Sequence, residues 1–206
     1  MSASLEFFTN PQSRGQIVRW MLEEVGEPYD THVLDYGTTM KGADYLAINP
    51  MGKVPAIRHG AQVVTECAAI CAYLADAFPA AGLLPPPEHR GAYFRWLFFA
   101  AGPIEAVFTA KAIGWEVPAD KQGMAGFGNF ELAMGTIEGA ISGRQFIAGD
   151  HFSAADVYVG SMLDFLLMFG SMQSTPAFDA YLGPLRERPA YRRAKEIDTA
   201  LIAANG

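Results

Sequence analysis

Residues 49–57, which read Asn-Pro-Met-Gly-Lys-Val-Pro-Ala-Ile, decide the fold of the first part of this chain. Proline has no backbone N–H group, so within a sheet it is confined to an edge or to the start of a strand. Pro55 therefore predicts a strand that begins beside it, with Val54 in an extended conformation. The N–H and C=O groups of Val54 are then free, and a free extended backbone can bind a peptide.

A helix is expected to begin at Glu66, directly after a strand that ends with Val63-Val64-Thr65. Residues 66–74 carry apolar side chains at helical spacing, and no linker separates them from the strand. The first N–H groups of a helix are unpaired and carry the positive end of its dipole, which suits a carboxylate. The edge backbone and this helix start together predict a site for a short acidic peptide.

These residues are similar to the glutathione-binding half of cytosolic glutathione transferases. In that family the residue before a cis-proline pairs with the cysteinyl backbone of glutathione, and a Glu-Ser or Gln-Ser pair at a helix start holds the γ-glutamyl group. The resemblance gives these roles to Val54, Pro55 and Glu66. The family's serine is Cys67 here, and a thiol is a weaker hydrogen-bond donor than a hydroxyl. We therefore expect glutathione binding to be weakened but not lost.

Composition narrows the class of protein. The chain has 206 residues, of which 50% are hydrophobic, enough for one large or two small domains. Its net charge of −7 argues against a nucleic-acid partner, because phosphates would be repelled. The start of the chain lacks a signal-peptide pattern, and no apolar run reaches the ~18 residues of a membrane span. We expect a cytoplasmic protein without a membrane partner.

The two cysteines, Cys67 and Cys71, lie four residues apart on the expected helix. This spacing is neither that of a Cys-x-x-Cys redox pair nor that of half a zinc site. Buried, inert thiols are the favoured interpretation, and we expect neither a metal site nor a cofactor. Glutathione would serve as a co-substrate.

Residues 1–78 are expected to alternate between strands and helices in the β-α-β then β-β-α order that is typical of a thioredoxin-like domain. Helical spacing and the Gly26 stop indicate the first helix, since glycine commonly follows the last turn. The expected strands cover residues 5–8, 29–34, 56–59 and 62–64, and the expected helices cover residues 14–25 and 66–77.

Residues 79–89 are rich in proline and read as a linker, because proline cannot continue a helix. Everything in residues 90–206 is helical by its pattern. The predicted fold class is therefore α+β, with a thioredoxin-like domain followed by an all-α domain. The expected helices of the second domain cover residues 90–111, 121–142, 154–172, 177–186 and 190–203.

Ser153 and Asp156 have the spacing of a capping box, in which each side chain accepts from the backbone N–H group of the other. At this distance behind the linker, the motif resembles the cap of the buried helix in the helical domain of glutathione transferases. The resemblance thus extends over nearly the whole chain, and it implies a homodimer. Both residues are expected to be structural.

A transferase must also activate the glutathione thiol, and the donor is expected between the first strand and the first helix. Ser13 matches the position of the catalytic hydroxyl in serine-type members of the family. Ser13 could equally be a helix N-cap, and one hydroxyl cannot easily do both. Asn10 is the second candidate donor, and Arg14 could stabilise a thiolate by its charge.

Lysines and large apolar side chains supply the remaining candidates. Lys53 is expected to reach the glycyl carboxylate of glutathione, and Lys41 either shares this role or is a solvated surface side chain. The hydrophobic electrophile is expected to contact Phe108, Trp115 and Met168, although most such residues belong to cores.

The sequence therefore predicts a homodimeric glutathione transferase that adds the thiolate of glutathione to hydrophobic electrophiles. A peroxidase, an isomerase or a lyase that uses glutathione on the same fold is one alternative. A protein that binds glutathione or another ligand without catalysis is another, because Cys67 replaces the family's serine and the thiol donor is undecided.

Overall fold

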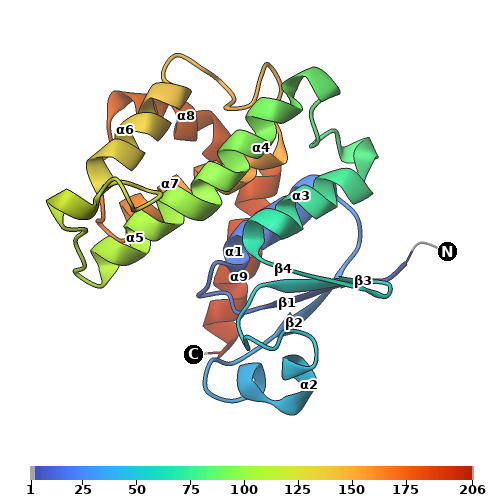
Figure 1. The fold of residues 1–206 in the computed structure, drawn as a ribbon. Coiled ribbons are helices and arrows are strands. Elements are labelled where there is room, and N and C mark those ends of the chain that lie inside the picture. The colour runs from blue at the N-terminus through green and yellow to red at the C-terminus, as the bar shows by residue number, and fades with distance from the viewer. Residues whose placement is uncertain (1–2, 206) are drawn as a thin grey trace. The chain divides into compact units, whose positions relative to one another are not determined.

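The computed structural model describes residues 3–205, and its contacts group the chain into two units (Figure 1). The first unit holds the residues up to Leu83 together with those from Arg188 onward. The second unit holds Leu84–Glu187. Each unit has its own buried core, and the two are described separately below.

The C-terminal helix α9 (Pro189–Asn205) groups with the N-terminal part of the chain. At its start, the guanidinium of Arg188 donates two hydrogen bonds to the carboxylate of Glu24, at 2.6 and 2.8 Å. Such a bidentate pair is among the stronger and more directional polar contacts in proteins. The domain boundaries expected near residues 78 and 90 stay a prediction.

A four-stranded mixed sheet with the order β2-β1-β3-β4 forms the centre of the first unit. β1 runs parallel to β2 and antiparallel to β3, and β3 runs antiparallel to β4. The buried Phe7 pairs with Thr31 on β2 and with Ile57 on β3. This arrangement confirms the α+β class and the thioredoxin-like first part. The strands are β1 (Leu5–Thr9), β2 (Asp30–Val33), β3 (Ala56–His59) and β4 (Gln62–Thr65).

The helices of the first unit follow the apolar spacing of the sequence. In α1, Ile17, Val18 and Met21 are fully buried, as the periodicity predicts. α1 ends where Gly26 adopts φ 77° and its N–H donates to the Leu22 carbonyl at 3.0 Å. These helices are α1 (Gly15–Val25), α2 (Ala43–Leu46), α3 (Cys67–Ala77) and α9, with short 3₁₀ segments η1 (Thr39–Lys41) and η2 (Pro79–Ala81).

The second unit is entirely helical, as predicted. Its central helix α7 is buried along most of its length and packs against α4 and α8. No helix within residues 3–205 is both long and apolar enough to cross a bilayer. The segments are η3 (Pro87–His89), α4 (Arg90–Phe99), the π-helical η4 (Ala100–Ile104), α5 (Glu105–Ala112), η5 (Ala119–Lys121), α6 (Phe130–Ile141), α7 (Ala154–Met168) and α8 (Pro176–Arg186).

The helix expected over residues 121–142 is wrong at its start, because α6 begins only at Phe130. Glycine weakens helices, and three glycines lie in the preceding segment; the last of them, Gly128, has φ 64°. The side chain of Asn129 then accepts a hydrogen bond from the Leu132 N–H at 2.8 Å and caps the helix.

Two other helix boundaries also differ from expectation. α7 ends at Met168 and not at residue 172, because Gly170 adopts φ 64° just beyond it. The helix expected over residues 90–111 is observed as α4 and α5, joined by the π-helical turn η4. Pro103 lies inside that turn, and a proline removes one helical hydrogen bond.

The capping box predicted at Ser153 and Asp156 is present at the start of α7. The fully buried carboxylate of Asp156 accepts from the Ser153 N–H at 2.9 Å and from the Ile147 N–H at 2.8 Å. It also accepts from the Tyr181 hydroxyl at 2.9 Å, while burial raises the pKa of Asp156. This carboxylate therefore joins α7, α8 and the loop before α7.

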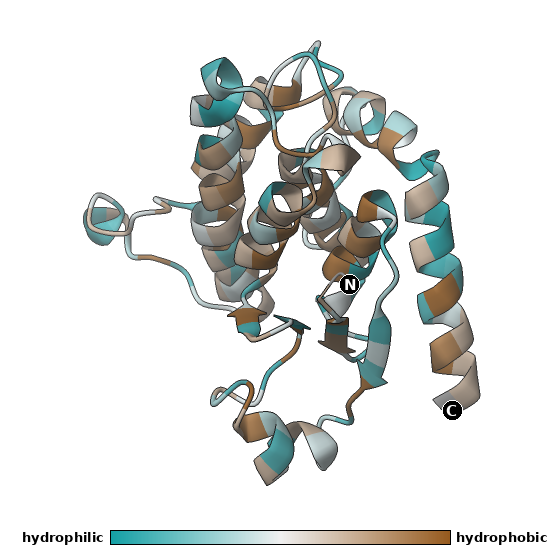
Figure 2. Cartoon of the chain, turned by 90° about the vertical axis from the view of Figure 1, so that its right-hand side faces the viewer, coloured by the Kyte–Doolittle hydropathy of each residue, from teal (hydrophilic) through white to brown (hydrophobic). Residues whose placement is uncertain are grey.

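Helix α9 contacts α1 through a narrow stripe of small and polar residues. Ala190, Ala194 and Asp198 are buried at four-residue spacing, so they lie along one face of the helix. In Figure 2, α9 carries both hydrophobic (brown) and hydrophilic (teal) residues. Alanines allow the two helix backbones to approach closely, and Asp198 brings a negative charge into the contact.

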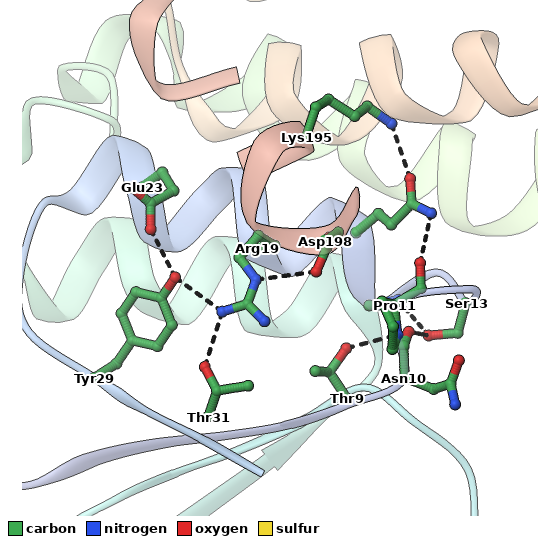
Figure 3. Close-up of polar contacts among 12 residues, drawn as sticks. Thr9, Asn10, Pro11, Ser13, Arg19, Glu23, Tyr29, Thr31, Lys195 and Asp198 are labelled. Carbon is green, nitrogen blue, oxygen red and sulfur yellow. Dashed lines mark hydrogen bonds and ion pairs between the residues drawn. The ribbon is translucent and has the colours of Figure 1, made fainter. Parts of the chain in front are cut away.

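That charge meets Arg19 of α1, of which only 1% is exposed (Figure 3). Arg19 donates to Asp198 at 3.2 Å, to the Tyr29 hydroxyl at 3.0 Å and to the Thr31 hydroxyl at 2.8 Å. Its guanidinium also lies 4.9 Å from the centre of the Phe7 ring. Burial raises the pKa of Asp198, and the charge of Arg19 opposes that rise.

Replacing Asp198 with alanine should lower the free energy of unfolding by about 3–5 kcal/mol, because the buried Arg19 charge would lose its partner. Unfolding in urea, followed by circular dichroism, measures the change. Glu196→Ala, at an exposed position of the same helix, is the matched control and should change stability by less than about 0.5 kcal/mol. Equal stability of the two variants would contradict the structural role of the pair.

A second ion pair lies across β1 and β3. Arg58 donates to both carboxylate oxygens of Glu6, at 2.8 and 2.7 Å, and the His32 ring lies 3.1 Å from the same carboxylate. The hydrogen bond from Arg58 is the main cause of a lowered Glu6 pKa. The folded state therefore favours the ionised carboxylate more than the unfolded state does.

This shift predicts a pH-dependent contribution to stability. Because the folded pKa of Glu6 is lowered, the contribution is present above the ordinary pKa near 4.5 and is lost as the pH falls through the folded value. The difference in unfolding free energy between the parent and Glu6→Gln should therefore shrink toward acid pH. Denaturant titrations at several pH values measure it, and a constant difference would refute the assignment.

Candidate functional site

The loop before β3 leaves one stretch of backbone unpaired. The peptide bond between Val54 and Pro55 is cis, and β3 begins at Ala56. Among residues 3–205, no hydrogen bond reaches the N–H or C=O group of Val54. These two groups are therefore available to an extended peptide, as the sequence predicts.

Three side chains hold the residues just before Val54. The Lys53 carbonyl accepts from the Tyr45 hydroxyl at 2.6 Å and from the Asn49 amide at 2.8 Å. The other side-chain atom of Asn49 accepts from the Met51 N–H at 3.1 Å. Sequence reasoning missed both side chains. The Asn-Pro turn signal could have indicated Asn49, since asparagine often bonds to the backbone two residues ahead, but no local signal indicates Tyr45.

Lys41 supplies the third contact. Its ammonium group donates to the Gly52 carbonyl at 2.6 Å, so in this structure it is bound to the loop. Lys53, in the same loop, is exposed. Binding of the glycyl carboxylate by Lys53 or Lys41 stays a prediction.

The start of α3 has an unusual backbone. Glu66 precedes the helix with φ 67° and ψ 119°, a conformation that costs a non-glycine residue of order 1–3 kcal/mol. Glu66 itself is exposed. Its carbonyl accepts from the Ile70 N–H at 2.8 Å, so the N–H groups before Ile70 lie at the positive end of the helix dipole.

Cys67 connects this helix start to the loop between β1 and α1. Its buried thiol lies 3.6 Å from the carbonyl oxygen of Arg14, a contact typical of a weak S–H donor. The structure thus brings Arg14 and Cys67 together, although they are far apart in the sequence. Cys71 lies deeper, where burial raises the pKa of its thiol well above the usual value. A thiol of this kind is inert at neutral pH.

The loop between β1 and α1 is closed by its own side chains (Figure 3). The Ser13 hydroxyl donates to the Asn10 carbonyl at 2.6 Å and accepts from the Gly15 N–H at 2.9 Å. The Asn10 side chain donates to the Leu34 carbonyl at 2.8 Å and accepts from the Gln12 N–H at 2.9 Å. The Ser13 hydroxyl therefore bridges the loop to the first residue of α1, whereas the N-cap position itself is occupied by Arg14.

The last residue of this loop region, Gly15, lies very close to Thr9 at the end of β1. A β-carbon at position 15 would overlap the hydroxyl of the fully buried Thr9, so only glycine fits there. Gly15 therefore lets α1 begin directly against the end of β1. Arg14 lies between Ser13 and this glycine.

The residues expected to contact an electrophile all lie in the second unit, and the structure does not gather them into one group. The Phe108 ring is buried and packs 5.9 Å from Phe169, the neighbour of Met168. Met168 is 61% exposed, at the end of α7. Trp115 is 52% exposed and lies edge-on to Phe127.

Trp115 lines a cavity of about 430 Å³ between α5, the following loop and the start of α6. Phe127 and Phe130 also line it, but Phe108 and Met168 do not. The Lys111 ammonium lies 3.8 Å from the centre of the Phe130 ring and contributes a positive charge. This size suits a small organic molecule. Within residues 3–205, no cluster of His, Cys, Asp and Glu side chains could hold a metal ion.

Comparison with known proteins finds similarity to glutathione S-transferases. Residues 13–77 match the model of the glutathione S-transferase N-terminal domain. Glutathione S-transferase A of Pleuronectes platessa is 29% identical over 162 residues, which cover 74% of this chain and 72% of that protein. The crystal structure of a glutathione transferase from Methylococcus capsulatus has 29% identity and a TM-score of 0.77, and the match covers 95% of this chain and 99% of that one.

A sphingomonad glutathione S-transferase was solved in complex with glutathione. It is 28% identical to this chain, with a TM-score of 0.76, and the match covers 94% of this chain and 98% of that one. The similarity thus includes both units.

The two hydrogen bonds of the Ser13 hydroxyl lead to a stability prediction. Ser13→Ala should lower the free energy of unfolding by about 1 kcal/mol, because the Gly15 N–H loses its acceptor. Urea unfolding measures the change, and Gln12→Ala at the neighbouring exposed position is the control. If Ser13→Ala were as stable as the parent, the hydrogen bonds of this hydroxyl would not stabilise the fold.

Proposed function

We propose that the chain is a glutathione transferase, similar to the proteins above, whose first unit binds glutathione and activates its thiol. Glutathione is the co-substrate, and its thiolate is transferred to a hydrophobic electrophile. The observation that carries the proposal is the unpaired backbone of Val54 beside the cis bond to Pro55.

Three parts of the first unit would bind the tripeptide. The N–H and C=O groups of Val54 pair with the cysteinyl backbone of glutathione in the manner of an added strand. The γ-glutamyl carboxylate lies at the start of α3, near Glu66 and Cys67, where the helix dipole favours an anion. The exposed ammonium of Lys53 attracts the glycyl carboxylate. Similarity to the sphingomonad enzyme with bound glutathione supports this placement.

Activation requires that the enzyme lower the thiol pKa. A thiol with a pKa near 8.5 is mostly protonated at pH 7, and a shift of about two units takes roughly 2.7 kcal/mol. Ser13 is the proposed donor, and its hydroxyl must then turn from the Asn10 carbonyl toward the sulfur. The second amide hydrogen of Asn10 is the alternative, and the charge of Arg14 would assist either donor.

The electrophile would be a hydrophobic molecule in contact with the second unit. Trp115 offers a half-exposed ring beside a cavity, whereas Phe108 packs against Phe169 and Met168 is exposed at the end of α7. Reaction with peroxides, isomerisation and ether cleavage need the same bound thiolate, so they stay alternatives to conjugation.

One observation favours a second function. The Ser13 hydroxyl already has both a donor and an acceptor partner, which leaves it without a ready hydrogen for a thiolate. A protein in this state would bind glutathione without activating it. The homodimer stays a prediction from the family resemblance, and the cytoplasmic location stays a prediction from the lack of a signal-peptide pattern. The resemblance also implies a role in detoxification.

Calorimetry and the ultraviolet absorbance of thiolate, recorded on the same complex, test the proposal. We expect the parent to bind glutathione and to lower the thiol pKa by about one to two units, and Ser13→Ala to bind glutathione but to restore most of the solution pKa. Asn10→Ala separates the second donor from the first. Gln12→Ala, an exposed neighbour, is the control.

The outcomes distinguish the catalytic protein from the non-catalytic one and identify the thiol donor. Binding with an unshifted thiol pKa would support the non-catalytic protein. A lowered pKa that survives Ser13→Ala but not Asn10→Ala would make Asn10 the donor. No heat on titration with glutathione would refute glutathione binding.

A further inference from the structure

Two consecutive carbonyl groups before Val54 are held by side chains from one short segment. Lys41 of η1 donates to the Gly52 carbonyl, and Tyr45 of α2 donates to the Lys53 carbonyl, both at 2.6 Å. Sequence analysis left Lys41 as either a ligand of the glycyl carboxylate or a solvated side chain, and it gave Tyr45 no role. The structure instead ties the segment that contains η1 and α2 to the backbone that would bind glutathione.

The segment is itself anchored to the sheet. Tyr45 is 3% exposed and belongs to a buried cluster with Phe8, Met40 and Ala56. Its ring centre lies 5.8 Å from that of Phe8, and the Val54 side chain packs against the same cluster. Burial raises the pKa of the Tyr45 phenol, so the hydroxyl keeps the hydrogen that it donates.

The bonded loop has little freedom. Gly52 has φ 56°, and a β-carbon there would lie 3.0 Å from the Lys41 ammonium and 3.1 Å from the Met40 carbonyl oxygen. Since the carbonyls of Gly52 and Lys53 are both engaged, the next backbone groups, those of Val54, are presented without a partner. Rigidity of this kind raises affinity, because less freedom is lost when the ligand binds.

We propose that Tyr45 and Lys41 are positioning residues that set the affinity for glutathione by holding the Val54 backbone ready, without touching the peptide themselves. This inference rests on the proposed function, since it requires that glutathione bind at Val54. It replaces a direct contact between Lys41 and the glycyl carboxylate with an indirect one through the Gly52 carbonyl.

Calorimetry with glutathione and steady-state kinetics with a generic aromatic electrophile provide the test. Tyr45→Phe should raise Kd and KM for glutathione about 3- to 10-fold, because one hydrogen bond to the Lys53 carbonyl is lost. Lys41→Met should raise them about 10-fold, and Lys41→Arg, which keeps the charged donor, should restore most of the affinity. The kcat at saturating glutathione should change less than about 2-fold. Asp44→Asn, at an exposed position of α2, is the control.

A truncated ligand separates the indirect role of Lys41 from a direct one. γ-Glutamylcysteine lacks the glycyl residue, so a direct contact with the glycyl carboxylate cannot form with it. A positioning role predicts that Lys41→Met weakens the binding of γ-glutamylcysteine by the same factor as that of glutathione. An effect on glutathione alone would overturn the inference for Lys41.

Other outcomes would also overturn the inference. If the parent binds glutathione and Tyr45→Phe binds it equally well, the positioning role is refuted while the proposed function stands. A fall in kcat with an unchanged KM would refute it as well, since it would place Tyr45 in the chemical step. If the parent binds neither ligand, both the inference and the proposed function fail. Urea unfolding of each variant shows that the measured protein is folded.

Discussion

The first unit depends on one buried positive charge. The guanidinium of Arg19 is almost fully excluded from water, and a buried charge of this kind is costly unless an opposite charge and hydrogen-bond acceptors compensate it. Its partners lie on α9 (Asp198), on β2 (Thr31) and in the chain before β2 (Tyr29). These three contacts connect α9, β2 and the chain before β2 to the same side chain of α1. The C-terminal helix therefore belongs structurally to the sheet that begins the chain.

Much of the fold could be predicted from the sequence, because short-range rules apply where they agree with packing. The apolar spacing of α1, the glycine that ends it and the proline that opens β3 all act within a few residues. The helix boundaries that were wrong lie at Gly128 and Gly170, where a left-handed backbone ends a periodicity that continues in the sequence. The place of α9 could not be predicted, since its contact with Arg19 spans nearly the whole chain.

The candidate site likewise contains residues that the sequence could indicate and residues that it could not. Val54, Pro55 and Glu66 are recognisable because a backbone edge and a helix start have local signatures. What Ser13 and Lys41 do depends on hydrogen bonds to the carbonyls of Asn10 and Gly52, which no residue pattern reveals. Tyr45 was missed for a related reason, since it lies on the separate short helix α2 and its hydroxyl donates to the Lys53 carbonyl of the loop. Sequence thus indicates the groups proposed to face glutathione better than the side chains that hold those groups in place.

At Glu66, the conformation of the backbone and the chemistry of the side chain favour different residues. Glycine would adopt its positive φ without cost, so the chain is less stable with a glutamate at this position than it need be. A search for stabilising substitutions would therefore favour glycine there, yet glycine would remove the only side chain that the position offers to an amino group of a ligand. Under the proposed function, the strained Glu66 backbone costs stability but supplies a carboxylate beside the ligand.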